Sequence, residues 1–119
     1  MAVTVTTQQN PIATKMVQDT AAAETAVDNT TGTFGVLYMV EIENAASNIV
    51  YFKLADAVSA TAGTTAADIC LRCPASSTRS YVFPNGITFS TGFCHWCVSA
   101  AAESSTGAPG SVAVRYITS

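Results

Sequence analysis

The feature that most constrains the fold is a series of short apolar segments between residues 33 and 119, each ended by turn-forming residues. Val, Ile, Thr and aromatic side chains favour strands, and segments of this length separated by turns are typical of antiparallel sheets. Helix formers are scarce, because the 119 residues include only three Leu and a total of six Glu and Lys. We therefore predict an all-β fold, a small antiparallel β-sandwich or jelly-roll-like barrel of six to seven strands.

Two of the expected turns carry further predictions. Residues 34–43 end in an alternation of apolar and acidic side chains, and a turn cluster separates them from residues 49–54, so these two segments are expected to form a hairpin. Pro84-Asn85-Gly86 is a strong turn signal that is expected to separate two strands. The expected strands cover residues 34–43, 49–54, 68–73, 79–83, 87–89, 93–98 and 112–117.

Residues 1–32 differ from the rest of the chain because they contain no aromatic side chain. Residues 14–27 have the Ala content of a short helix, but their Thr content and the lack of a wide apolar stripe argue against an isolated one. We predict an extended N-terminal arm over residues 1–32 that becomes ordered on a partner or forms a short edge strand. A flexible terminus is the alternative, and the β-sandwich domain then covers residues 33–119.

Charge and hydropathy exclude several classes of partner. The chain has 5 basic and 8 acidic residues, and five scattered cations cannot neutralise a track of phosphates, so no nucleic acid partner is expected. No apolar run reaches the roughly 18 residues of a membrane span, so no membrane partner is expected either. The first five residues have neither the basic start nor the apolar core of a secretory signal, which favours synthesis in a reducing compartment.

The four cysteines are the strongest candidates for a site. Cys70-x-x-Cys73 and Cys94-x-x-Cys97 are separated by twenty residues, which matches the spacing of a zinc ribbon. Such a site needs four thiolates on a tetrahedron, each about 2.3 Å from the metal. Both pairs, however, lie in expected strands, where residues i and i+3 point to opposite faces. Each pair would then be split, with one cysteine pointing inward and the other outward.

Two other states of the cysteines are open. If residues 68–73 and 93–98 are neighbouring strands, disulfides could join Cys70 to Cys97 and Cys73 to Cys94, or Cys70 to Cys94 and Cys73 to Cys97. The four could also be reduced, partly buried thiols that act as small apolar side chains. No cofactor is expected, with zinc as the alternative. A dithiol redox site would need a helix after the pair, and no helical pattern follows Cys97.

No constellation of residues favours catalysis, so we expect the protein not to be an enzyme. His95 is the only histidine, and adjacent strand residues point apart, so Cys94 and His95 would make a poor nucleophilic pair. We interpret His95 as a surface or interface residue. There is no Gly-rich phosphate loop, and Glu41 and Glu43 share a strand face that is expected to be solvated.

Consecutive aromatic residues must point in opposite directions along a strand. One of Tyr51 and Phe52 is therefore expected to be exposed, and His95 and Trp96 are expected to split in the same way. An exposed Tyr or Trp96 could stack on a sugar ring, so a carbohydrate-binding sandwich is one functional hypothesis.

The order of these segments resembles small virion proteins of tailed bacteriophages, of the capsid-decoration (cement) type. The resemblance covers residues 36–118, and the four cysteines are not part of it. It implies a structural protein on the capsid exterior, made in the host cytoplasm, that bridges neighbouring major capsid subunits as a homo-oligomer, a trimer, with an extended arm along the shell. It is carried by Tyr38-Met-Val-Glu-Ile-Glu-Asn44, Val50-Tyr-Phe-Lys-Leu-Ala-Asp56, Phe83-Pro-Asn-Gly-Ile-Thr-Phe-Ser-Thr-Gly92 and Val112-Ala-Val-Arg-Tyr-Ile117.

Small size, low charge and short strands suit a structural module as well, because backbone pairing at a sheet edge needs no special side chains. A head-fibre, tail or baseplate component is the nearest alternative function. From another class, a small zinc-binding or dithiol module remains open.

Overall fold

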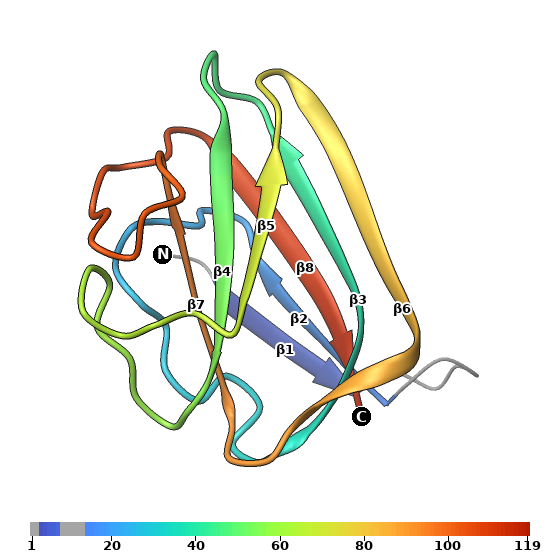
Figure 1. Ribbon diagram of the computed structural model, residues 1–119. Coiled ribbons are helices and arrows are strands. Elements are labelled where there is room, and N and C mark those ends of the chain that lie inside the picture. Colours follow the sequence, from blue (N-terminus) through green and yellow to red (C-terminus); the bar gives the residue numbers. More distant parts are fainter. Residues whose placement is uncertain (1–2, 8–13) are drawn as a thin grey trace.

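The computed structural model describes residues 3–7 and 14–119 (Figure 1). Every regular element in these residues is a β-strand, which confirms the predicted all-β class. The described residues contain no helix with the length and apolarity that crossing a membrane requires. In chain order the strands are β1 (Val3–Thr7), β2 (Lys15–Asp19), β3 (Gly35–Asn44), β4 (Val50–Asp56), β5 (Ile69–Cys73), β6 (Ser77–Phe89), β7 (Phe93–Val98) and β8 (Val112–Thr118).

The strands form two antiparallel sheets, and the main core lies between them. The larger sheet has the order β1-β2-β8-β3-β6 and the smaller has the order β5-β4-β7 (Figure 1). Side chains alternate along the strands: Val114 and Tyr116 of β8 are buried, whereas Arg115 between them points to the other face. Phe52 of the smaller sheet packs on Tyr116 with ring centroids 6.0 Å apart. A small β-sandwich results.

The predicted hairpin between residues 34–43 and 49–54 is wrong, because β3 and β4 belong to different sheets. The chain turns between the sheets at Asn44, which is 2% exposed. Its amide Nδ2 donates to the carbonyl oxygens of Asn48, Cys73 and Pro74, at 2.9, 3.3 and 3.0 Å. Its Oδ1 accepts the backbone N–H of Ala46 at 3.0 Å. One side chain thus satisfies the backbone groups of a corner that crosses between layers.

The predicted turn at Pro84-Asn85-Gly86 does not end a strand, because β6 continues through it from Ser77 to Phe89. Its pairing with β3 shifts instead, from Met39 opposite Val82 to Leu37 opposite Ile87. Gly86 has a φ of 72° at this bulge, and a Cβ there would lie 2.2 Å from the side chain of Val36. The turn residues therefore build a β-bulge within one long strand.

Residues 14–32 belong to the sandwich, which differs from the arm expected over residues 1–32. β2 lies between β1 and β8 in the larger sheet, and Val17 and Asp19 are fully buried. Val27 pairs with His95 of β7 through two backbone hydrogen bonds of 2.8 and 3.1 Å. The alternation of apolar and polar residues that identifies a strand is interrupted in β2, because Asp19 carries a carboxylate at an inward position. β1 is an edge strand, as expected in the interpretation that residues 1–32 form a short edge strand.

The outer face of the smaller sheet is also covered, so all six residues of β7 are buried. The loops that follow β4 and β7 lie beside β7 on the left of Figure 1. Ala26, Ala60 and Ala62 pack there against a second small core that contains Trp96 and Val98. Alanine side chains let these loops approach the sheet closely, which gives the Ala-rich connections a structural role.

Candidate functional sites

The four cysteines are split between the two faces of the smaller sheet, as the strand alternation predicted. Cys73 and Cys97 point into the main core, whereas Cys94 belongs to the second core and Cys70 is exposed. Strand β4 lies between β5 and β7, so two strand spacings, about 9.6 Å, separate the two cysteine pairs. The strands are not the neighbours that the disulfide hypothesis required.

This separation decides what the cysteines can form. A disulfide needs Cα atoms roughly 4.4–6.8 Å apart, and all four cysteines are free thiols. Four sulfurs divided between two faces do not make the tetrahedron of a zinc ribbon. Nor does any group of three or more His, Cys, Asp or Glu side chains that could hold a metal ion occur within residues 3–7 and 14–119.

The environments of the enclosed thiols oppose ionisation. Burial raises the pKa values of Cys73 and Cys94, and it raises the pKa of Cys97 to about 12, with the nearby Cys73 and Asp19 adding to the shift. The Cys94 thiol donates to the Ala57 carbonyl oxygen at 3.1 Å. Because a thiolate is the reactive form of cysteine, these groups suit packing rather than nucleophilic chemistry.

A chain of buried polar side chains crosses the main core, and the sequence did not predict it. The Asp19 carboxylate lies 2.9 Å from His95 Nε2, and His95 Nδ1 lies 2.9 Å from the Tyr116 hydroxyl. The Tyr116 hydroxyl in turn lies 2.7 Å from Thr30 Oγ1. His95 is 1% exposed, so its interpretation as a surface or interface residue is wrong. The sequence did indicate the buried position of His95, because residues two apart in a strand share a face and His95 lies two residues from the core residues Phe93 and Cys97.

The carboxylate, imidazole and hydroxyl follow one another as in a nucleophilic triad, but their enclosure prevents that use. Asp19 and Tyr116 are both 0% exposed, and burial raises the pKa of the Tyr116 hydroxyl. Neither of the two depressions described below is lined by these residues. We therefore interpret the chain as an arrangement that satisfies buried polar groups and joins β2, β7 and β8.

Trp96 is not available as a stacking platform for a sugar. Its side chain is 1% exposed beneath the loops that cover the smaller sheet, and its Nε1 has no hydrogen-bond partner. Next to it, Lys53 is 2% exposed and donates from Nζ to the Ala102 carbonyl oxygen at 2.8 Å. The expectation that either His95 or Trp96 is exposed fails, because the larger sheet covers the face of β7 that carries His95 and the loops cover the face that carries Trp96.

Asp56 is the carboxylate with the most hydrogen bonds, and its role is also structural. Its oxygens accept the backbone N–H groups of Ser90, Thr91 and Gly92 at 2.9, 2.8 and 3.3 Å. Desolvation alone would raise the pKa of this carboxyl, but the three N–H donors and the Ser90 hydroxyl outweigh it and lower the pKa. Asp56 thus fixes the turn between β6 and β7 in its ionised form.

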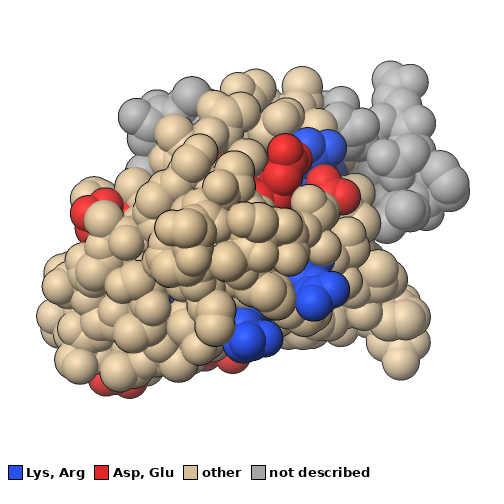
Figure 2. Space-filling view, turned by 90° about the horizontal axis from the view of Figure 1, so that it is seen from above, with Lys and Arg blue, Asp and Glu red and all other residues tan. Residues whose placement is uncertain are grey.

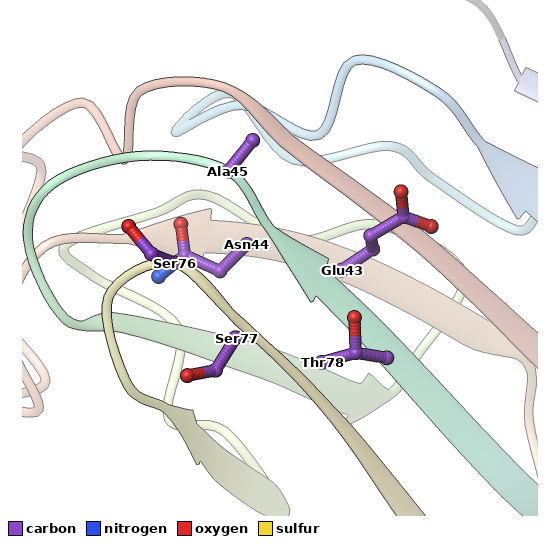
Figure 3. A pocket seen from close by; sticks show the side chains of 6 residues that line it. All are labelled: Glu43, Asn44, Ala45, Ser76, Ser77 and Thr78. Carbon is purple, nitrogen blue, oxygen red and sulfur yellow. The ribbon is translucent and has the colours of Figure 1, made fainter.

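A depression of about 320 Å³ lies where the ends of β3 and β6 meet (Figure 3). Glu43 and Thr78 are opposite each other in the strand register. The Ser77 hydroxyl points away from these two side chains and donates to the Ala75 carbonyl oxygen at 3.0 Å. The polar atoms therefore do not converge on one point as catalytic groups must. The lining residues are Glu43, Asn44, Ala45, Ser76, Ser77 and Thr78.

A second depression, of about 490 Å³, lies over the loops on the smaller sheet. Its carboxylates are Glu24 and Asp28, and one Asp28 oxygen already accepts the Ala60 N–H at 3.0 Å. The rest of its lining consists of Ala and Thr side chains, with no aromatic ring and no cation. Neither depression presents the apolar, enclosed walls that small-molecule sites use.

The outer face of the larger sheet carries apolar side chains that no other strand of the described residues covers, although Met16, Met39 and Ile117 are half-buried there. Strand register places Met16, Ile117, Met39 and Val82 side by side in a row across β2, β8, β3 and β6. Val82 is 64% exposed. The next row holds Arg115 and Glu41, whose Nε and Oε1 atoms lie 3.2 Å apart. Figure 2, which views the molecule from above, shows few charged side chains on a mostly uncharged surface.

Comparison with known proteins gives no relative: no family model, curated protein or solved structure matches this chain.

Proposed function

We propose that the protein is a structural virion component that decorates and stabilises a phage capsid by bridging neighbouring major capsid subunits. The resemblance of residues 36–118 to capsid-decoration proteins supports this proposal, and so does the distribution of side chains. The buried histidine and carboxylate are held in internal hydrogen bonds, and the enclosed thiols are shielded from solvent. What the molecule offers to partners is sheet surface.

The observation that carries the proposal is the open edge at β1. Among the described residues Val3–Thr7 pairs only with β2, and its side chains Thr4, Val5 and Thr6 are exposed. The segment contains no charged residue and no Pro, which are the features that usually prevent an edge strand from pairing with another chain. A strand of a capsid subunit can extend the sheet here through backbone hydrogen bonds.

Many weak contacts of this kind become strong on a shell, because each bridging molecule binds a repeated lattice at more than one point. Binding in this way strengthens the capsid without any chemical step. A head-fibre, tail or baseplate role uses the same edge on a different part of the particle, so location on the virion separates the two functions.

The experiment is addition of the purified protein to expanded, undecorated heads of the phage that encodes it, followed by sedimentation. We expect saturable co-sedimentation and greater resistance of the filled heads to heat. Val5→Lys, which puts a charge on the exposed edge, should weaken binding, whereas Val58→Lys in the loop after β4 should not. Failure of the wild-type protein to bind expanded heads would overturn the proposal.

A further inference from the structure

The outer face of the larger sheet has an apolar half and a polar half. Its apolar row consists of Met16, Ile117, Met39 and Val82, and its polar row has Arg115 and Glu41 at the centre. Arg115 lies on β8 and Glu41 on β3, and their side chains are 41% and 29% exposed. The face is therefore amphipathic along the strands, and Glu43 adds a second, exposed carboxylate in the next row, opposite Ala113 and Thr78.

This arrangement is self-complementary. A two-fold axis that runs parallel to the strands, between β8 and β3, places the outer faces of two copies against each other and keeps apolar row on apolar row. The same rotation sets Ile117 opposite the second copy's Met39. It also sets Arg115 opposite the second copy's Glu41, and the reverse, so that four charges alternate in sign. An axis perpendicular to the strands and midway between the two rows would set apolar side chains against charged ones.

The area of the face limits the affinity of such a dimer. Five strands at about 4.8 Å spacing give a width of about 24 Å, and six residues along a strand give about 20 Å, which is roughly 500 Å². Stable interfaces commonly bury about 800 Å² per partner. A pair held by this face alone should dissociate on dilution.

We infer that the outer face of the larger sheet is a symmetric interface for a second copy of this chain, centred on Met39 and Ile117 and aligned by reciprocal Arg115–Glu41 pairs. Two copies, rather than the three that the phage resemblance implies, are the assembly that this face favours. The inference does not depend on the proposed function, since it concerns the protein alone in solution. The edge at β1 remains free in such a pair.

The test is sedimentation velocity of the purified protein over a wide concentration series. We expect a monomer–dimer equilibrium for the wild type. Glu41→Arg and Arg115→Glu each place like charges together, and each should raise the dimer dissociation constant by about tenfold or more. The double variant Glu41→Arg/Arg115→Glu restores alternating signs and should return the dissociation constant to near the wild-type value. Met39→Lys should leave a monomer.

Val58→Ser is the matched control, because Val58 is 54% exposed but lies in the loop beside the smaller sheet. It should leave the dissociation constant unchanged. Exposed ion pairs contribute little to folding, so the charge variants should keep the circular dichroism spectrum of the wild type. A wild type that is monomeric at every concentration, or that forms trimers, would overturn the inference. So would a double variant that dimerises no better than the single ones.

Discussion

Asp19 and His95 form a hydrogen-bonded pair in a core that is otherwise built mainly from apolar side chains. The carboxylate also accepts the Ala21 N–H at 3.1 Å, so it supports the turn after β2. A polar group in such a place costs stability unless each of its partners is present. The pair therefore holds the N-terminal part of the chain on the sandwich, and its loss should affect the whole molecule.

We expect Asp19→Ala to lower the free energy of unfolding by about 3–5 kcal/mol, because it leaves His95 Nε2 without its partner in the core and removes the acceptor of the Ala21 N–H in the turn after β2. Urea denaturation followed by circular dichroism measures the change. The matched control is Glu103→Ala, which removes an exposed carboxylate and should change stability by less than about 0.5 kcal/mol. Equal effects of the two substitutions would contradict the assigned role of Asp19.

The buried thiol of Cys97 should lower the free energy of unfolding at alkaline pH. Burial raises the pKa of the Cys97 thiol from 9.0 to about 12. Between these two pH values the folded state keeps the thiol proton, whereas the unfolded state releases it. The resulting stabilisation is complete below pH 9 and is lost as the pH rises through about 12. Between pH about 8 and about 11 the wild type should lose about 2–3 kcal/mol more than Cys97→Val, which cannot ionise. Urea midpoints at both pH values measure this, and parallel pH profiles would contradict it.

At the scale of elements, local pattern predicted where strands form but not which strands pair. The split of each cysteine pair followed from alternation alone. The hairpin between β3 and β4 failed because Asn44 and its distant partners Cys73 and Pro74 turn the chain into the other layer. Contacts between residues about thirty positions apart leave no local signal.

Asn44 should therefore be among the most sensitive polar residues outside the centre of the core. Asn44→Ala leaves three carbonyl oxygens and one N–H without their partner, and we expect a loss of about 2–4 kcal/mol in the free energy of unfolding. Asn85→Ala, at an exposed position in the β6 bulge, is the control and should be nearly neutral. Chemical denaturation compares the two, and a neutral Asn44→Ala would show that the corner does not depend on this side chain.

At the scale of the whole molecule, the two sheets enclose Asp19, His95 and Tyr116 and leave the outer face of the larger sheet at the surface. The smaller sheet is covered on its outer face by Ala-rich loops, whereas the larger sheet is open at the row that runs from Met16 to Val82. This asymmetry could not be predicted from composition, since it depends on which loops fold over which sheet. It supports a molecule that acts by binding other proteins.

The most direct test of the proposed capsid role is electron cryo-microscopy of virions whose genome encodes this chain. We expect density of the size of this sandwich at regular positions on the capsid exterior, in contact with neighbouring major capsid subunits. Density for the sandwich on the tail or baseplate would favour the alternative structural role. Particles that contain none of the protein would contradict the proposed function.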